Sequence, residues 1–305
     1  MTQFLNLLVN GLSLGSIYAL VALGFVIVFK ATEVVNFAHG SLLVLGGYVM
    51  ARAHEKMAFV PALLLGILAA GLAALIVERV FIRKLQNGSV NALAILTIGV
   101  DVVLITELTR RFGADTLSIG DPWGNKLVGL GGGVRVPEAR VAAILAAAVL
   151  LGLFFVAFKY SSWGVSMRAS AEDGEAAALM GIRRGRVTAT AWVVAGVLAA
   201  VAALFLTAFP SPGIDPSVRL TALRAFPAAI LGGLDSTAGA VIGGLAIGLT
   251  ESLVAGYGIT VGGPYGLTLH GTGGSLADVI PYLVMLVVLL VRPSGLLGTR
   301  ELTRV

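Results

Sequence analysis

The sequence contains no cysteine, and its 305 residues include only three histidines, His39, His54 and His270. The absence of cysteine excludes disulfides, thiolate metal sites and cysteine nucleophiles. The histidines are far apart and lack the H-x-x-x-H spacing of a helical metal site. No lysine follows a glycine, so the G-x-x-x-x-G-K-[ST] loop that cradles nucleotide phosphates is absent. We therefore expect no cofactor, no metal site and no catalytic residue, and hence a protein that is not an enzyme.

Charge is also scarce. Only 12% of the residues are charged and 57% are hydrophobic, whereas a soluble domain carries about 25% charged residues. This composition indicates an integral membrane protein. The net charge of +5 does not indicate a nucleic-acid partner, because the basic residues stand at the ends of apolar runs, where they orient helices in a bilayer. The first apolar run is too long for a signal-peptide core, so we expect it to be a retained span.

Apolar runs close to the roughly 20 residues needed to cross a bilayer recur along the chain. We expect spans at about 7–29, 58–77, 91–108, 141–158, 187–209, 238–255 and 278–291. Two runs are too short for regular spans: residues 42–50, and residues 219–233, which Pro227 interrupts. The sequence therefore predicts an all-α polytopic bundle of about 8–9 transmembrane segments, two of them short and broken. We expect residues 1–305 to form a single transmembrane domain.

The two short segments resemble each other. Asn36-Phe37-Ala38 leads to Leu45-Gly46-Gly47, and Ala225-Phe226-Pro227 leads to Leu231-Gly232-Gly233. Interrupted segments in corresponding halves indicate pseudo-repeat halves with a translocation site at their interface. The alternative is that glycine-rich apolar stretches look alike without being repeats. The candidate translocation-pathway residues are Asn36, Phe37, His39, Arg224 and Phe226.

Polar residues inside apolar segments are functional candidates, because they are costly to bury in a membrane. Each also has a structural interpretation. His39 can line the pathway or satisfy the carbonyls of a broken helix, Asn36 can instead cap a helix, and Arg224 can reach a lipid headgroup. Asp101 and Glu251 can couple transport to protons, or they can form buried pairs or stay protonated.

A polar island at residues 162–182 separates two long apolar runs. Arg168, Glu172, Asp173 and Glu175 would each cost about 2.5–3.5 kcal/mol at the bilayer centre, so the island lies outside the hydrocarbon. Lysine and arginine residues crowd both of its ends, which is typical of a cytoplasmic loop. We expect this loop to run from about 160 to 187.

Within the island, Glu175-Ala176-Ala177, three residues and Gly181 form the pattern E-A-A-x-x-x-G. The pattern resembles the coupling loop of ABC importer permeases, a short helix that docks into a groove on the ATPase subunit. Alanine favours a helix, Gly181 can end it in a left-handed cap, and Ile182 can anchor that end. An ordinary amphipathic loop helix is the alternative, since the further Ile-x-Leu-Pro of that loop is absent. The candidate coupling residues are Arg168, Glu172, Asp173, Glu175, Ala176, Ala177, Gly181 and Ile182.

Taken together, several stretches resemble the first permease subunit of the branched-chain amino-acid (LIV-type) ABC importers. The resemblance covers nearly the whole chain and keeps order and spacing. The matching stretches are N-G-L-S-L-G-S-I-Y-A-L at 10–20, V-V-N-F-A-H-G at 34–40, R-A-x-A-E-D at 168–173, L-x-G-I at 179–182, A-F-x-A-A-I-L-G-G-L at 225–234, and R-P-x-G-L-L-G at 292–298.

The resemblance implies a permease subunit of a binding-protein-dependent importer in the bacterial inner membrane, forming half of the translocation pathway. It implies as partners a second permease subunit in a heterodimer, two ABC ATPase subunits, a periplasmic solute-binding protein and membrane lipid, but no nucleic acid. A cytoplasmic coupling loop would place the N-terminus outside and the C-terminus inside. The alternatives are an ion-coupled secondary transporter using Asp101 or Glu251, a membrane scaffold without transport, or the same importer architecture for another amino acid, urea or a short amide.

Overall fold

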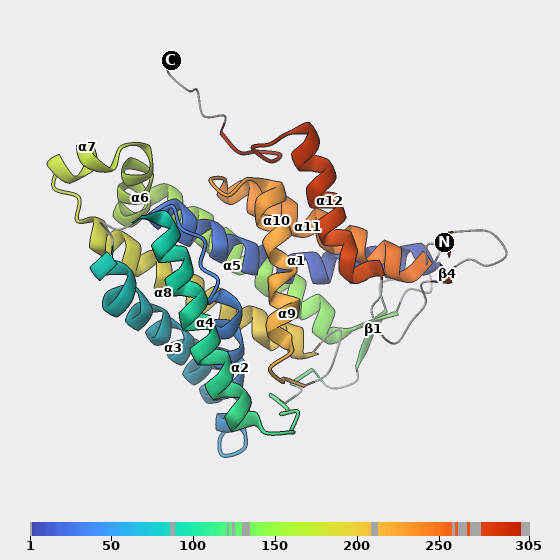
Figure 1. Cartoon of the computed structure of the whole chain (residues 1–305). Coiled ribbons are helices and arrows are strands. Elements are labelled where there is room, and N and C mark those ends of the chain that lie inside the picture. The colour runs from blue at the N-terminus through green and yellow to red at the C-terminus, as the bar shows by residue number, and fades with distance from the viewer. Residues whose placement is uncertain are drawn as a thin grey trace. The chain divides into compact units, whose positions relative to one another are not determined.

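A computed structural model describes residues 2–85, 89–120, 122–123, 126–129, 135–208, 213–257, 260–261, 267–268 and 276–299. The described chain is almost entirely helical (Figure 1). The helices are α1 (Thr2–Thr32), α2 (His39–His54), α3 (Phe59–Val77), the π-helical turn η1 (Glu78–Ile82), the 3₁₀ turn η2 (Arg83–Leu85), α4 (Val90–Phe112), α5 (Glu138–Tyr160), α6 (Ser162–Glu172), α7 (Gly174–Leu179), α8 (Arg184–Ala208), α9 (Val218–Leu223), α10 (Ala225–Gly232), α11 (Thr237–Tyr257) and α12 (Leu276–Val291). Two short antiparallel pairs accompany them: β1 (Leu127–Gly129) with β2 (Arg135–Pro137), and β3 (Thr260–Val261) with β4 (Leu267–Thr268).

Six helices of the described residues are long and apolar enough to cross a membrane. They agree with the first six predicted spans of full length, and they confirm the all-α polytopic class. The seventh predicted span corresponds to α12, whose apolar part, Val279–Val291, is shorter. The total number of crossing segments stays a prediction. The six are Thr2–Thr32, Phe59–Leu85, Val90–Phe112, Glu138–Tyr160, Arg184–Ala208 and Thr237–Tyr257.

The structure places a break next to each of the two short segments. The first break comes before α2, where Glu33 adopts a positive φ of 58°, and α2 then continues without interruption for 16 residues. The second break falls at Arg224, between α9 and α10. The segment is interrupted as expected, three residues before Pro227: this proline has no N–H to donate to the carbonyl of Leu223, the last residue of α9.

Contacts group the chain into two compact units, each assembled from separate stretches. The first unit consists of Met1–Ala22, Trp123–Ala147 and Leu223–Val305, and the second of Leu23–Pro122 and Ala148–Ala222. α1 and α5 each contribute residues to both units. The expectation of a single permease domain over residues 1–305 stays a prediction.

In the first unit, α11 packs closely against α1 through glycine. A Cβ atom added to Gly15 would lie 2.8 Å from the Cα of Leu245, and one added to Gly11 would lie 2.8 Å from the Cα of Leu249. On α11 itself, Gly243 allows a similar approach to the backbone of α10. Small residues on α1 therefore allow the two helices to pack closely.

The first unit also brings together two of the stretches that carry the family resemblance. The N–H groups of Leu296 and Leu297 donate to the carbonyls of Leu231 and Gly232 at 2.8 and 3.0 Å. Gly233 then ends α10 with a φ of 102°. The turn after α12 therefore satisfies carbonyls at the end of α10 that the helix leaves unpaired. By contrast, Gly46-Gly47 lies within α2, so the two repeat-like motifs differ in local structure, and the repeat stays a prediction.

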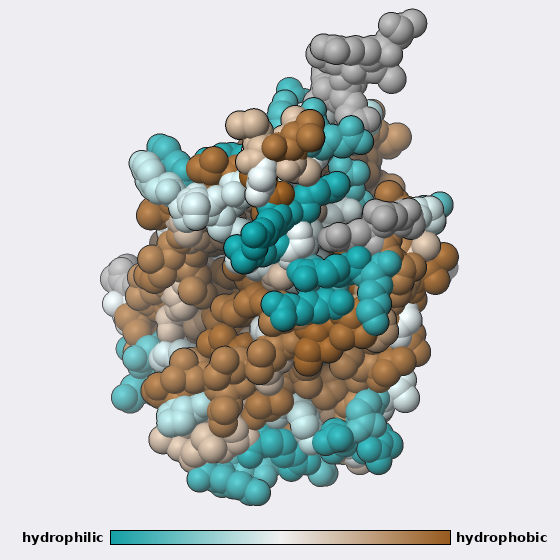
Figure 2. Space-filling view, turned by 90° about the vertical axis from the view of Figure 1, so that its left-hand side faces the viewer, coloured by the Kyte–Doolittle hydropathy of each residue, from teal (hydrophilic) through white to brown (hydrophobic). Residues whose placement is uncertain are grey.

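In the second unit, α2 packs against α3, α4 and α8, around buried side chains such as Leu42 and Trp192. The outer face of α3 carries apolar side chains that are 54–61% exposed. Figure 2 shows apolar residues over the middle of this side of the molecule, with hydrophilic residues gathered above and below. Such a face suits contact with lipid tails. The exposed row on α3 consists of Val60, Leu64, Leu68, Leu72 and Ile76.

The contact between α1 and α11 predicts that Gly15→Ala is destabilising, because the new Cβ would meet the backbone of Leu245 rather than a movable side chain. We expect a loss of about 1–3 kcal/mol, measured as a lower midpoint of thermal unfolding in detergent. Gly152→Ala is the control, since a Cβ on Gly152 of α5 has no atom within 4 Å. Equal midpoints for the two variants would contradict this packing.

Candidate functional site

The predicted coupling loop forms two short helices, α6 and α7, between α5 and α8 in the second unit. α6 begins after Ser161, whose side chain accepts a hydrogen bond from the N–H of Gly164 at 3.1 Å. The chain then bends at Asp173, whose Oδ1 accepts bonds from the N–H groups of Glu175 and Ala176 at 3.0 and 2.9 Å. Asp173 is therefore the N-cap of α7. The sequence predicts the helix but not this division.

α7 ends in the predicted left-handed turn at Gly181, whose φ is 84°. The Gly181 N–H donates to the carbonyl of Ala178, and the Ile182 N–H donates to the carbonyl of Ala177, both at 3.0 Å. These two bonds form a Schellman cap. A Cβ at position 181 would have no atom within 4 Å. Glycine is thus required here by backbone conformation and not by space.

Hydrogen bonds hold α6 against its neighbours. The Arg168 guanidinium donates to the carbonyls of Phe158 and Lys159 at the end of α5, the second at 3.3 Å. The indole N–H of Trp163 donates to the carbonyl of Val187 on α8 at 3.4 Å. Arg168 therefore stabilises the carboxyl end of α5, where a cation is favourable. Its predicted contact with a partner stays a prediction.

The end of α7 exposes two large apolar side chains, Leu179 at 88% and Met180 at 84%. Our sequence analysis missed both, although two large apolar residues directly before the glycine that ends a loop helix were a visible signal. Ala177 is buried beneath the turn, and Ile182 is half-buried. The other candidate coupling residues are exposed: Arg168, Glu172, Asp173, Glu175, Ala176 and Gly181.

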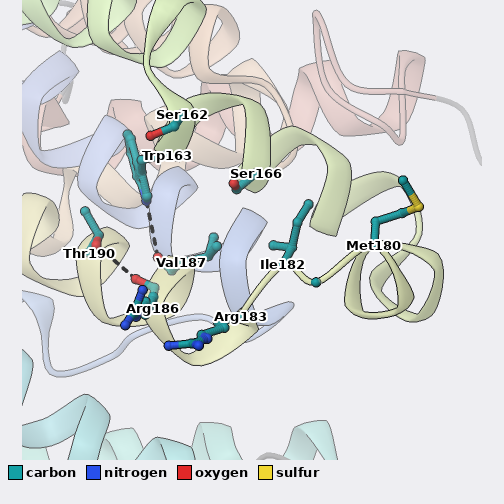
Figure 3. Close-up of a pocket in the computed structure, with 10 residues that line it drawn as sticks. Ser162, Trp163, Ser166, Met180, Ile182, Arg183, Arg186, Val187 and Thr190 are labelled. Carbon is teal, nitrogen blue, oxygen red and sulfur yellow. Dashed lines mark hydrogen bonds between the residues drawn. The ribbon is translucent and has the colours of Figure 1, made fainter.

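A pocket of about 510 Å³ opens beside this exposed end. α6 contributes Ser162, Trp163 and Ser166, while α8 contributes Arg186 and Thr190 (Figure 3). The turn that follows α7 closes the pocket on its remaining side. The loop therefore presents an apolar tip next to a hollow with polar and cationic walls, a surface that a docking protein can engage.

Three of the candidate pathway residues lie together before and at the start of α2, in the second unit. Asn36 is fully buried, and its Oδ1 accepts a backbone hydrogen bond at 3.0 Å from the residue two positions later. The N–H of Phe37 donates to Oγ1 of Thr97 at 3.2 Å. His39 is fully buried, with its ring centroid 4.6 Å from that of Phe25. Asn36 therefore forms a local turn before α2, which itself has no side-chain cap, and its role in the pathway stays a prediction.

The other two candidates, Arg224 and Phe226, belong to the first unit, so a common pathway for all five stays a prediction. Nη1 of Arg224 lies 3.6 Å from Oε1 of Glu251, which is only 7% exposed. The hydroxyl of Tyr18 donates to the second oxygen of this carboxylate at 2.9 Å. Because Glu251 has both a cation and a donor, the buried-pair interpretation is favoured over a proton-coupling site.

Asp101 is paired as well. Its carboxylate forms an ion pair with Arg219 of α9 within the second unit, and the two side chains are 8% and 27% exposed. The sequence analysis did not single out Arg219, because the two residues are 118 positions apart. Within the described ranges, His, Asp and Glu residues form no group of three or more that could hold a metal ion.

The chain matches the family described as branched-chain amino acid transport system / permease component over residues 7–289. It belongs to this family. The high-affinity branched-chain amino acid transport system permease protein LivH of Escherichia coli (strain K12) is 32% identical over 323 residues, covering 99% of this chain and 98% of the relative. The corresponding protein BraD of Pseudomonas aeruginosa is 30% identical over 320 residues, with the same coverage. A probable LivH of Methanocaldococcus jannaschii is 29% identical over 93% of this chain and 89% of its own length.

Family membership confirms the resemblance drawn from the sequence motifs, and it confirms a multi-pass protein of the inner membrane. Members are transport permease components and not enzymes. Among solved structures, PsaBC from Streptococcus pneumoniae in complex with Fab aligns with a TM-score of 0.49 and 15% identity, over 95% of this chain and 92% of that chain. A likeness at this level carries no argument about function.

The pair of Asp101 and Arg219 yields a prediction about stability. Asp101→Asn leaves a partly buried arginine without its carboxylate, and we expect a loss of about 1–3 kcal/mol, less than for a fully buried pair because Arg219 is partly exposed. The double variant Asp101→Asn/Arg219→Gln removes both charges and should recover part of the loss, as thermal unfolding in detergent can measure. A double variant that loses the sum of the two single effects would contradict the pairing.

Proposed function

We propose that the chain is one of two permease subunits in an ABC importer for branched-chain amino acids and forms half of its translocation pathway. Family membership over residues 7–289 supports the importer class. The names of LivH and BraD, which are high-affinity branched-chain amino acid permeases, support the solute. The partners are a second permease subunit in a heterodimer, two ABC ATPase subunits and a periplasmic solute-binding protein. The paired state of Asp101 and Glu251 argues against the ion-coupled alternative.

The observation that carries the coupling role is the exposed apolar end of α7. Leu179 and Met180 lie almost fully in solvent in a loop whose other side chains are largely polar. Large apolar side chains on a short, rigid helix are suited to fill a groove on a partner protein. The caps at Asp173 and Gly181 hold the helix in shape before binding, which lowers the ordering cost of docking.

This role places the loop in the cytoplasm, with the N-terminus outside and the C-terminus inside. ATP hydrolysis would reach the permease as a mechanical change transmitted through α6 to α5 and α8, because Arg168 and Trp163 bond α6 to both helices. Such a change can bias the subunit between inward-facing and outward-facing states. The residues that solute passes are Asn36, Phe37, His39, Arg224 and Phe226.

The first experiment is affinity purification of the tagged chain from its native membrane in mild detergent, followed by identification of the proteins that co-purify. We expect an ABC ATPase and a second, related permease. Uptake of radiolabelled leucine, isoleucine and valine, with urea and acetamide for comparison, then tests the solute. A chain that purifies alone, under conditions that preserve a known ABC complex, would overturn the importer assembly.

The tip of α7 provides a specific test of coupling. Leu179→Ser/Met180→Ser should lower the yield of co-purified ATPase and the rate of uptake at least about tenfold, since contact anchors of this kind each contribute 1–2 kcal/mol or more. Both side chains are exposed, so the thermal unfolding of the chain should not change. Leu179→Met keeps an apolar tip and is the control. Normal ATPase yield from the serine variant would refute the docking role of α7.

The cap of α7 provides a second test. Gly181→Val forces a β-branched residue into a left-handed conformation, which costs of order 1–3 kcal/mol and should fray the end of the helix. We expect reduced ATPase-driven uptake with normal amounts of the chain in the membrane. Gly181→Asn is the matched control, because asparagine tolerates this conformation and should retain most of the uptake. Equal uptake by the two variants would count against the cap.

A further inference from the structure

A second pocket, of about 440 Å³, lies where the end of the α3 span meets the start of α8, within the second unit. It differs in character from the pocket beside α7. Leu75, Ala189 and Val193 of α3 and α8 form an apolar floor, beside which Gly185 and the hydroxyl-bearing Thr190 also line the pocket. Its rim carries three arginines, which come from η1, η2 and the first turn of α8. The rim consists of Arg79, Arg83 and Arg186, and Arg186 and Thr190 also line the pocket beside α7.

The charge of this rim is only partly balanced within the chain. Glu78 is fully buried, and it accepts hydrogen bonds from Arg83 at 3.3 Å and from the hydroxyl of Thr188 at 2.9 Å. This carboxylate is therefore hydrogen-bonded to groups inside the protein. Arg79 and Arg186 are exposed, and neither takes part in an ion pair among the described residues. The pocket thus combines an apolar floor with an excess of positive charge.

The position of the rim relative to the bilayer follows from the two spans. Arg79 and Arg83 belong to the last turns of Phe59–Leu85, and Arg186 to the first turn of Arg184–Ala208. Long basic side chains at the ends of spans lie at the level of lipid headgroups. The exposed apolar row of α3 leads to this pocket. Leu72 belongs to the row, and Leu75, which lines the pocket, is its neighbour three residues later on the helix. In Figure 2, hydrophilic side chains lie directly above the apolar part of this face.

We propose that this pocket binds an anionic phospholipid. Its phosphate lies between Arg79 and Arg186, and its acyl chains lie on the floor of the pocket and along the apolar row of α3. Arg83 is a positioning residue, because it already bonds Glu78 and the carbonyl of Gly185. A soluble anion would use the arginines but not the apolar floor, and a zwitterionic lipid would not neutralise the excess charge. An anionic lipid satisfies both features.

The test is a lipid titration of the full-length tagged chain in mild detergent, read by native mass spectrometry with dioleoyl phosphatidylglycerol. Arg79→Gln/Arg186→Gln should weaken binding about thirtyfold, since each basic residue near a lipid surface contributes roughly a factor of five to affinity. Arg79→Lys/Arg186→Lys keeps the charge and should retain most of the affinity. Dioleoyl phosphatidylcholine should bind weakly, and equally, to all variants, which also reports that each is folded.

The matched control is Arg183→Gln/Arg184→Gln, which removes the same charge from the adjoining turn, where neither residue lines this pocket. It should bind phosphatidylglycerol like the unaltered chain. Equal weakening in the control and in the pocket variant would show a diffuse charge effect and overturn the site. Displacement of the lipid by millimolar glycerol phosphate alone would assign the pocket to a soluble anion. Loss of ATPase co-purification in the pocket variant, with lipid binding unchanged, would assign it to the partner protein.

Discussion

Carboxylates inside this apolar chain depend on internal partners, because water is absent from the hydrocarbon and an isolated ion there is costly. Glu78 pairs within five residues of itself, whereas Asp101 and Glu251 pair with arginines of other segments, on either side of the break between α9 and α10. Arg219 ties α9 to α4 through Asp101, and Arg224 ties the turn before α10 to α11 through Glu251. The pairs are Glu78 with Arg83, Asp101 with Arg219, and Glu251 with Arg224.

The loop of α6 and α7 and the arginine-rimmed pocket share one property. In both, some groups are hydrogen-bonded within the chain, while neighbouring side chains stay exposed. α7 is capped at both ends, yet Leu179 and Met180 are exposed. The rim of the pocket uses Arg83 internally, yet Arg79 and Arg186 remain in solvent. One surface therefore suits an apolar protein groove, and the other suits an anionic lipid.

Much of the fold could be predicted from the sequence, because hydropathy over about 20 residues is a strong signal and backbone pairing within helices is obligatory in a bilayer. The cap at Gly181 was also predictable, since only glycine adopts its φ of 84° without strain. The break in the second short segment was predictable from Pro227, which cannot donate to the carbonyl four residues earlier, but its position at Arg224 was not.

The sequence by itself determined the membrane class, the main spans, the polar loop and the family, because these rest on composition, local spacing and ordered motifs. Only the tertiary structure decided that Asp101 meets Arg219 and that Leu179 and Met180 are exposed. The reason is physical. Asp101 and Arg219 are 118 positions apart, and no local pattern encodes a contact over that distance.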